Sequence, residues 1–192
     1  MEEWYAYPLL IVVGFIVGFI NTVAGGGSLL SLPILIFLGL PSTLANGTNR
    51  VAVIFQTAIA TAGFKSKGVS TFPFNLYLGC SAFIGSIIGA NLAVDINGPL
   101  FNRILAVVMI CVVLIVAFGP KISINEVQER LTGKYLWLGI IAFFFFGIYG
   151  GFINAGIGFI IILFLHYINK MTLVRSNATK VAVVFMYMVS AL

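Results

Sequence analysis

Polar and apolar residues divide the chain into long uncharged runs separated by short polar loops. The runs extend from Pro8 up to Arg50 and over residues 72–94, 104–120 and 135–169. Each supplies at least one apolar segment near the roughly 20 residues that a helix needs to cross a bilayer. This pattern predicts an all-α fold, a polytopic transmembrane helical bundle. We expect helices near residues 8–24, 28–39, 50–64, 73–94, 102–118, 136–154, 157–169 and 178–192.

Composition leads to the same class. Of 192 residues, 61% are hydrophobic and 8% are charged, whereas soluble domains carry about 25% charged residues. The first run follows Glu2 and Glu3 rather than Lys or Arg and has no small-residue cleavage site. We therefore interpret it as a retained span and not as a signal peptide.

The cations predict an orientation in the membrane. Alternate threading of the helices places eight of the ten cations on one side: Lys65, Lys67, Lys121, Arg130, Lys134, Lys170, Arg175 and Lys180. Only Arg50 and Arg103 fall on the other side. The positive-inside rule makes the richer side cytoplasmic, so we expect a multi-pass protein of the cell inner membrane with its N-terminus outside. The net charge of +5 therefore reflects topology, and we expect no nucleic-acid partner.

Two stretches of the chain resemble each other. Gly18-Phe19-Ile20-Asn21 recurs as Gly151-Phe152-Ile153-Asn154, and the stretch from Arg50 to Phe55 matches the stretch from Lys180 to Phe185. Five helical elements separate equivalent points, and an odd number reverses the direction in which the second copy enters the membrane. The chain therefore reads as an inverted-topology repeat, which is common in secondary transporters. We assign residues 1–134 to the first transmembrane repeat and 135–192 to the second.

The second repeat is shorter than the first. It has no counterparts of the helices near 73–94 and 102–118. If the repeat is complete in the whole protein, on the order of 60 to 70 further residues should follow. We therefore expect this chain to be a fragment that lacks part of its C-terminal side.

Glycine clusters interrupt both repeats. Ala24-Gly25-Gly26-Gly27-Ser28 breaks the first apolar stretch, and Gly156-Ile157-Gly158 is its counterpart. Unpaired backbone inside a bilayer is tolerated only where protein or a water-filled cavity satisfies it, and a half-helix N-terminus favours anions. The alternative is that these glycines only allow close helix packing. The candidate substrate-binding residues are Asn21, Thr22, Gly25, Gly26, Gly27, Ser28, Asn154, Gly156 and Gly158.

Two cations follow cap-type residues. The loops 46–50 and 176–180 end in Arg50 and Lys180 and precede predicted helices. A positive charge at a helix N-terminus opposes the helix dipole unless an anion or a lipid headgroup is near. We interpret both residues as anion-attracting groups at opposite mouths of the pathway. The alternative is that both simply extend to the membrane surface.

Other polar or small residues have structural interpretations. Ser81, Gly85 and Gly89 recur every four residues and predict a packing seam between helices. His166 is interpreted as a satisfied interfacial residue rather than a proton relay. Gln56 either lines a pathway or bonds a neighbouring helix.

Several chemical functions are disfavoured. Cys80 and Cys111 lie in apolar segments without a CxxC pattern or a neighbouring histidine, so we expect no metal and no disulfide. The hydrophobic segments contain no Asp or Glu, the usual groups for proton or sodium coupling. They also offer no acid/base pair or nucleophilic triad. We therefore expect no cofactor and no enzyme activity.

Several motifs resemble the sulfite exporter TauE/SafE family. They are the stretch from Gly18 to Ser28, Leu32-Pro33, and Ala45-Asn46-Gly47-Thr48-Asn49, with further support from residues 85–90 and 150–159. The resemblance covers nearly the whole chain. It implies a permease of seven or eight helices that moves sulfite, organosulfonates or related anions across the inner membrane. The second break departs from the family pattern, because Phe159 and Ile160 replace a third glycine and a small residue.

We thus expect a secondary membrane transporter that moves a small anion by alternating access around a site between the two breaks. Its partners would be the anion, the lipid bilayer and, in some assemblies, a second copy. The main alternative is a non-transporting partner subunit or chaperone of another membrane protein, and a membrane enzyme is the third.

Overall fold

The computed structural model describes residues 6–94, 96–118 and 128–192, and within them it contains eight α-helices and no strand. The all-helical fold class is confirmed. The helices are α1 (Ala6–Val23), α2 (Ser28–Phe37), α3 (Ser42–Ser66), α4 (Phe74–Val94), α5 (Gly98–Phe118), α6 (Lys134–Phe152), α7 (Ile157–Tyr167) and α8 (Leu173–Ser190).

Helix lengths match a membrane. The helices α4 and α6, together with the Gly98–Ile115 part of α5, are long and apolar enough to span a bilayer. By contrast α2 has 10 residues and α7 has 11. At 1.5 Å per residue each is about 15 Å long, half the roughly 30 Å of the hydrocarbon core. These two helices are half-spans.

Apolar side chains cover the outside of the bundle. Phe15 on α1 is 79% exposed, Phe55 on α3 67% and Ile59 74%. Polar side chains such as Asn49 and Thr179 are buried instead. This distribution suits a protein whose surroundings are lipid.

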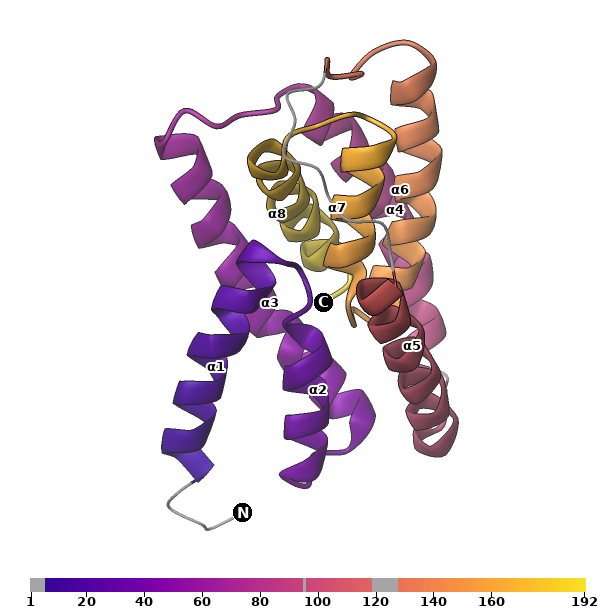
Figure 1. The fold of residues 1–192 in the computed structure, drawn as a ribbon. Helices are drawn as coiled ribbons and strands as arrows, with labels where there is room; N and C mark the ends of the chain where they lie inside the picture. The colour runs from indigo at the N-terminus through magenta and orange to yellow at the C-terminus, as the bar shows by residue number, and fades with distance from the viewer. Residues whose placement is uncertain (1–5, 95, 119–127) are drawn as a thin grey trace.

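The two helical hairpins enter from opposite ends of the molecule. The hairpin α1–α2 rises from the N-terminal end in Figure 1, whereas α6 descends from the other end and α7 returns to it. The turns of both hairpins meet near the middle. The order long, short, long thus occurs twice, in α1–α2–α3 and in α6–α7–α8. This order agrees with an inverted repeat, which itself stays a prediction.

A backbone-to-backbone seam joins α4 to α6. A Cβ atom at Gly85 or Gly89 would collide with the carbonyl oxygens of Phe144 or Ile148 on α6. A Cβ at Gly151 would collide in turn with the Ser86 carbonyl on α4. Glycine is therefore required on both sides for this close approach. The packing seam predicted for α4 is confirmed, and its partner is α6.

Two helix starts were predicted wrongly. The third helix begins at Ser42 and not at residue 50, and the last begins at Leu173 and not at residue 178. The cap-type residues in 46–50 and 176–180 are therefore helical. Two of their side chains form long-range hydrogen bonds instead: Asn46 Nδ2 donates to the Phe152 carbonyl at 3.0 Å, and Thr179 Oγ1 donates to Thr71 Oγ1 at 2.9 Å.

The seam can be tested by comparing the stability effects of two glycine-to-alanine changes, one inside the seam and one outside it. Gly147→Ala would place a Cβ 2.8 Å from the Ala82 Cα, and we expect it to destabilise the protein by about 1–3 kcal/mol, the usual cost of overpacking. The control is Gly63→Ala, because Gly63 has nothing within 4 Å. There the change should be neutral or stabilising by up to about 1 kcal/mol. Thermal unfolding in detergent measures both, and equal effects would contradict the seam.

Candidate functional site

The two chain breaks cross at one pair of glycines. Gly25 lies four residues after Asn21, and Gly158 lies four residues after Asn154. A Cβ on Gly25 would lie 2.5 Å from the Gly158 Cα, so the two backbones are in direct contact. Gly25 also has φ +84°, which side-chain-bearing residues rarely adopt. Glycine is required here both by space and by torsion.

A side-chain network holds the first break. Asn21 Oδ1 accepts a hydrogen bond from the Gly27 amide at 3.3 Å, and Asn21 Nδ2 donates to Gln56 Oε1 at 2.9 Å. Gln56 Nε2 donates in turn to the Gly18 carbonyl at 2.9 Å and to Thr22 Oγ1 at 2.8 Å. Of its two interpretations, Gln56 therefore fits the one in which it bonds a neighbouring helix, here α1.

A second network holds the other break and reaches across to the first. Asn154 Oδ1 accepts from the Tyr187 hydroxyl at 2.9 Å. Asn154 Nδ2 donates to Ser28 Oγ at 3.4 Å, and Asn49 Nδ2 donates to the same oxygen at 3.1 Å. Ser28 thus links the start of α2 to the turn that follows α6.

Lys180 caps the end of α1. Its Nζ donates to the carbonyls of Asn21 at 3.0 Å and Thr22 at 2.9 Å, and to Asn177 Oδ1 at 2.7 Å. The side chain is 2% exposed. The two carbonyls belong to the last turn of α1, where a cation also interacts favourably with the helix dipole.

Arg50 caps the end of α6 in the same way. Its Nη2 donates to the Gly151 carbonyl and, at 3.2 Å, to the Phe152 carbonyl, while Nη1 donates to the Ala191 carbonyl. The residue is 6% exposed. Each cation therefore caps a broken helix in the other half of the chain. We call this pair the exchanged caps.

Neither exchanged cap has a carboxylate partner in the part of the chain that the structure describes. In the described residues, the ion pair within 4 Å is that of Arg175 with Glu129, and neither residue belongs to the exchanged caps. No helix of the structure contains an Asp or Glu. Among the described residues, the partners of these two buried cations are carbonyl oxygens, and an anion near them would be favoured electrostatically.

A small cavity lies at the crossing. Its volume is about 10 Å³, near the lower limit for one water molecule. Its lining combines both breaks with the third and eighth helices: Asn21, Gly25, Thr57, Asn154, Ile157, Gly158, Lys180, Val181 and Val184. On another side, Arg50 and Asn46 border a separate cavity of about 700 Å³ between α3, α4, α5 and α8.

The structure brings five of the candidate residues to the small cavity: Asn21, Gly25, Asn154, Gly158 and Lys180. Ser28 does not line the cavity, but its hydroxyl accepts a hydrogen bond from Asn154, which does.

The other candidates face elsewhere. Gly26 lies under the Phe159 ring, and a Cβ there would approach Cζ to 2.7 Å. A Cβ on Gly156 would lie 2.7 Å from Val112 Cγ1 on α5. The Gly27 amide and the Thr22 hydroxyl serve the Asn21–Gln56 network. Whether any candidate binds substrate stays a prediction.

Sequence reasoning missed Thr57 and Tyr187. Thr57 lies two helical turns after Arg50 and so shares its face, which is a signal that could have been used. Tyr187 lies in an apolar stretch, and nothing in that stretch indicated that its hydroxyl meets Asn154.

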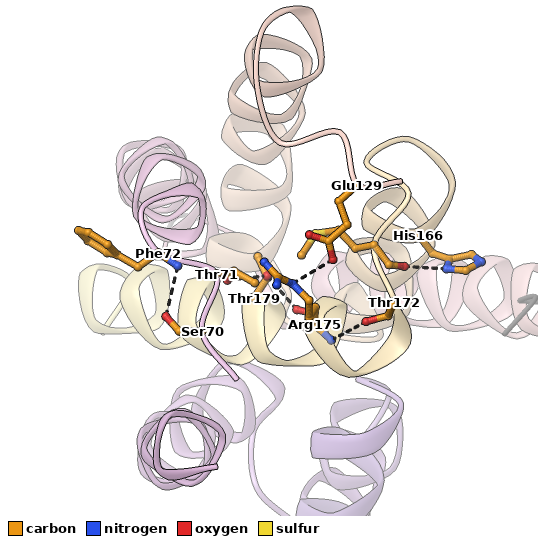
Figure 2. A network of polar contacts seen from close by, with 9 residues as sticks. Ser70, Thr71, Phe72, Glu129, His166, Thr172, Arg175 and Thr179 are labelled. Carbon is orange, nitrogen blue, oxygen red and sulfur yellow. Dashed lines mark hydrogen bonds and ion pairs between the residues drawn. The ribbon is translucent and has the colours of Figure 1, made fainter. Parts of the chain in front are cut away.

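A separate polar network surrounds the start of α8 (Figure 2). Arg175 pairs with Glu129 at 2.9 Å, and Thr179 Oγ1 donates to Thr71 Oγ1 at 2.9 Å. His166 is buried, with Nδ1 3.0 Å from the Met171 carbonyl. This network ties three loops together, and His166 has the satisfied environment that its interfacial interpretation expects.

Comparison with known proteins gives a family match and several relatives. Residues 10–192 match the family described as sulfite exporter TauE/SafE. A "probable membrane transporter protein" of Haemophilus influenzae is 31% identical over 81% of this chain and 60% of its own length. "Probable membrane transporter protein YfcA" of Escherichia coli K12 is 33% identical over 79% of this chain and 57% of its own.

An archaeal relative is more distant. A "probable membrane transporter protein" of Methanocaldococcus jannaschii is 27% identical over 92% of this chain and 67% of its own length. The chain thus spans about 60% of the length of the first of these relatives. No solved structure matches the chain significantly.

The exchanged caps generate the test of this site. Lys180→Met keeps the length of the side chain but leaves two carbonyls of α1 without this donor, and we expect a loss of stability of about 1–3 kcal/mol. Because Lys180 is buried, the loss should be the same at low and high salt. Thermal unfolding measures it. Lys65→Met at an exposed position is the control, and equal shifts for the two variants would contradict the capping role.

Proposed function

Because the chain belongs to the sulfite exporter TauE/SafE family, we propose that it forms part of a secondary membrane transporter that moves a small anion by alternating access. The names of the relatives support transport. The observation that supports an anion as the substrate is the burial of Lys180 beside the crossing of the two breaks. Lys180 has no carboxylate partner in the described structure.

The proposed site combines one charge with neutral donors. Lys180 supplies the positive charge, and the side-chain amides of Asn21 and Asn154 supply N–H groups on the same cavity. Ile157 and Gly158 lie in the first turn of α7, where backbone amides and the helix dipole favour an anion. A small oxyanion such as sulfite, or the headgroup of an organosulfonate, has the acceptor atoms for these donors.

The size of the cavity supports an occluded conformation. About 10 Å³ does not hold an anion of several atoms. Binding therefore requires the hairpin turns to separate. Since each turn carries half of the lining, a small rocking of one half of the bundle against the other would open the site toward one side at a time.

The positions of the exposed and half-buried cations that the structure describes support the orientation proposed from sequence. Six of them lie at the end where α3 and α7 end and α6 and α8 begin: Lys65, Lys67, Arg130, Lys134, Lys170 and Arg175. Lys121 lies outside the described residues. Arg103 lies at the opposite end, in the first turns of α5. Lys180 and Arg50 are buried inside the bundle, so we assign their charges to neither face. The six-to-one asymmetry favours a cytoplasmic location for the richer end.

Charge reversal of the site tests the anion. Asn154→Asp keeps the acceptor for Tyr187 but adds a negative charge to the cavity. Repulsion of about 4 kcal/mol at 4 Å and an effective dielectric constant of 20 should weaken anion binding roughly a thousandfold. The measurements are counterflow by the reconstituted full-length protein with sulfite, sulfonates and carboxylates, and the anion-dependent rise in Tm.

The matched control is Asn97→Asp, on the exposed loop before α5, whose Oδ1 accepts from the Leu100 amide and would still do so. It should leave flux and the Tm shift intact. If the Asn154→Asp protein keeps the full anion-dependent rise in Tm, the anion does not bind at this site. Absence of flux for every anion, with stoichiometric copurification of a second membrane protein, would favour a non-transporting partner subunit.

Labelling tests the orientation. In a background with Cys80→Ser and Cys111→Ser, a membrane-impermeant thiol reagent should label Lys67→Cys only from the cytoplasmic side and Asn97→Cys only from outside. Both positions are exposed in loops at opposite ends. The reverse pattern would invert the proposed topology.

A further inference from the structure

One face of α1 has the form of a packing seam but no partner in the structure. A Cβ on Gly14 or on Gly18 would meet nothing within 4 Å. The surrounding side chains are large and apolar, with Ile11 73% and Phe15 79% exposed. Glycines four residues apart on an apolar helix allow another backbone to approach closely.

The equivalent face of α6 does hold a helix. Gly18 corresponds to Gly151 through the repeated Gly-Phe-Ile-Asn, and Gly14 corresponds to Gly147, since each lies four residues earlier. A Cβ on Gly147 or Gly151 would collide with the backbone of α4. The same pair of positions is therefore a filled seam in one half of the chain and an empty one in the other.

The helix α4 packs on α8 as well as on α6, and the matching position on α3 can be compared. Gln56 follows the Arg50–Phe55 stretch as Met186 follows its match, Lys180–Phe185. Met186 packs on Gly79 of α4, where a Cβ would lie 2.8 Å from Cε. Gln56, in contrast, borders an unfilled cavity of about 250 Å³ between α1, α2 and α3, which Gly14 and Gly18 also line. An apolar groove is thus open at the place where α4 packs in the other half.

We propose that this groove between α1 and α3 is the docking site of a transmembrane helix that resembles α4, with small residues every four positions, supplied by a part of the full-length protein outside these 192 residues. The relatives support this source, because the chain spans only 57–60% of the length of two of them. A second copy's α4 is a poor occupant, because its glycines already face its own α6. The inference rests on the inverted repeat predicted from sequence, which the alternating access of the proposed function also assumes.

Stability of the full-length protein tests the groove without any transport assay. Gly14→Leu should lower its Tm by several degrees, because a leucine fills the space that the docked backbone needs. Gly63→Leu is the matched control: Gly63 too is a helical glycine with nothing within 4 Å, but it lies outside the groove, and the Tm of this variant should stay unchanged or rise slightly. Gly147→Leu, in the filled seam, should lower the Tm as Gly14→Leu does.

Disulfide crosslinking identifies the occupant even if Gly14→Leu does not fold. With Cys80 and Cys111 replaced by serine, Gly14→Cys should crosslink within one polypeptide to a cysteine placed at a small residue of a downstream helix. Crosslinking between two polypeptides, no crosslink at any small residue, a full-length protein without a further helix, or equal Tm values for Gly14→Leu and Gly63→Leu would each overturn the proposal. None of these results bears on anion binding, so failure here leaves the proposed function to its own test.

Discussion

The fold depends on how the carbonyl groups at the ends of two broken helices are satisfied inside a bilayer. The helices α1 and α6 end within the molecule, and the carbonyl groups of their last turns need hydrogen-bond donors there. Lys180 and Arg50 supply the donors, and each comes from the opposite half of the chain. A cation at a helix C-terminus also meets the negative end of the dipole, so the same contact offsets part of the cost of burying the charge.

The exchanged caps also position the residues of the proposed anion site. They hold the two turns close enough for Gly25 and Gly158 to touch, and they bring Lys180 to the cavity between Asn21 and Asn154. The proposed motion of one hairpin would therefore change both its own cap and the lining of the proposed site. The rigid seam of α4 with α6 provides a frame against which such motion can take place.

Much of this arrangement could be predicted from sequence because it depends on local signals. The glycine clusters predicted the breaks, and the four-residue spacing of Ser81, Gly85 and Gly89 predicted the seam. The roles of Arg50 and Lys180 could not be predicted, because their partners are backbone carbonyls about a hundred or more residues away, and the polar residues before each cation resemble helix caps. Phe159 over Gly26 was equally hidden, since it depends on how the two breaks cross.

The most direct test of the exchanged caps is an experimental structure of the full-length protein in lipid nanodiscs, at a resolution that shows side chains. We expect side-chain density from Lys180 to the Asn21 and Thr22 carbonyls and from Arg50 to the Gly151 and Phe152 carbonyls. Density that instead carries either cation outward to a membrane surface, with the helix ends uncapped, would contradict the exchanged caps.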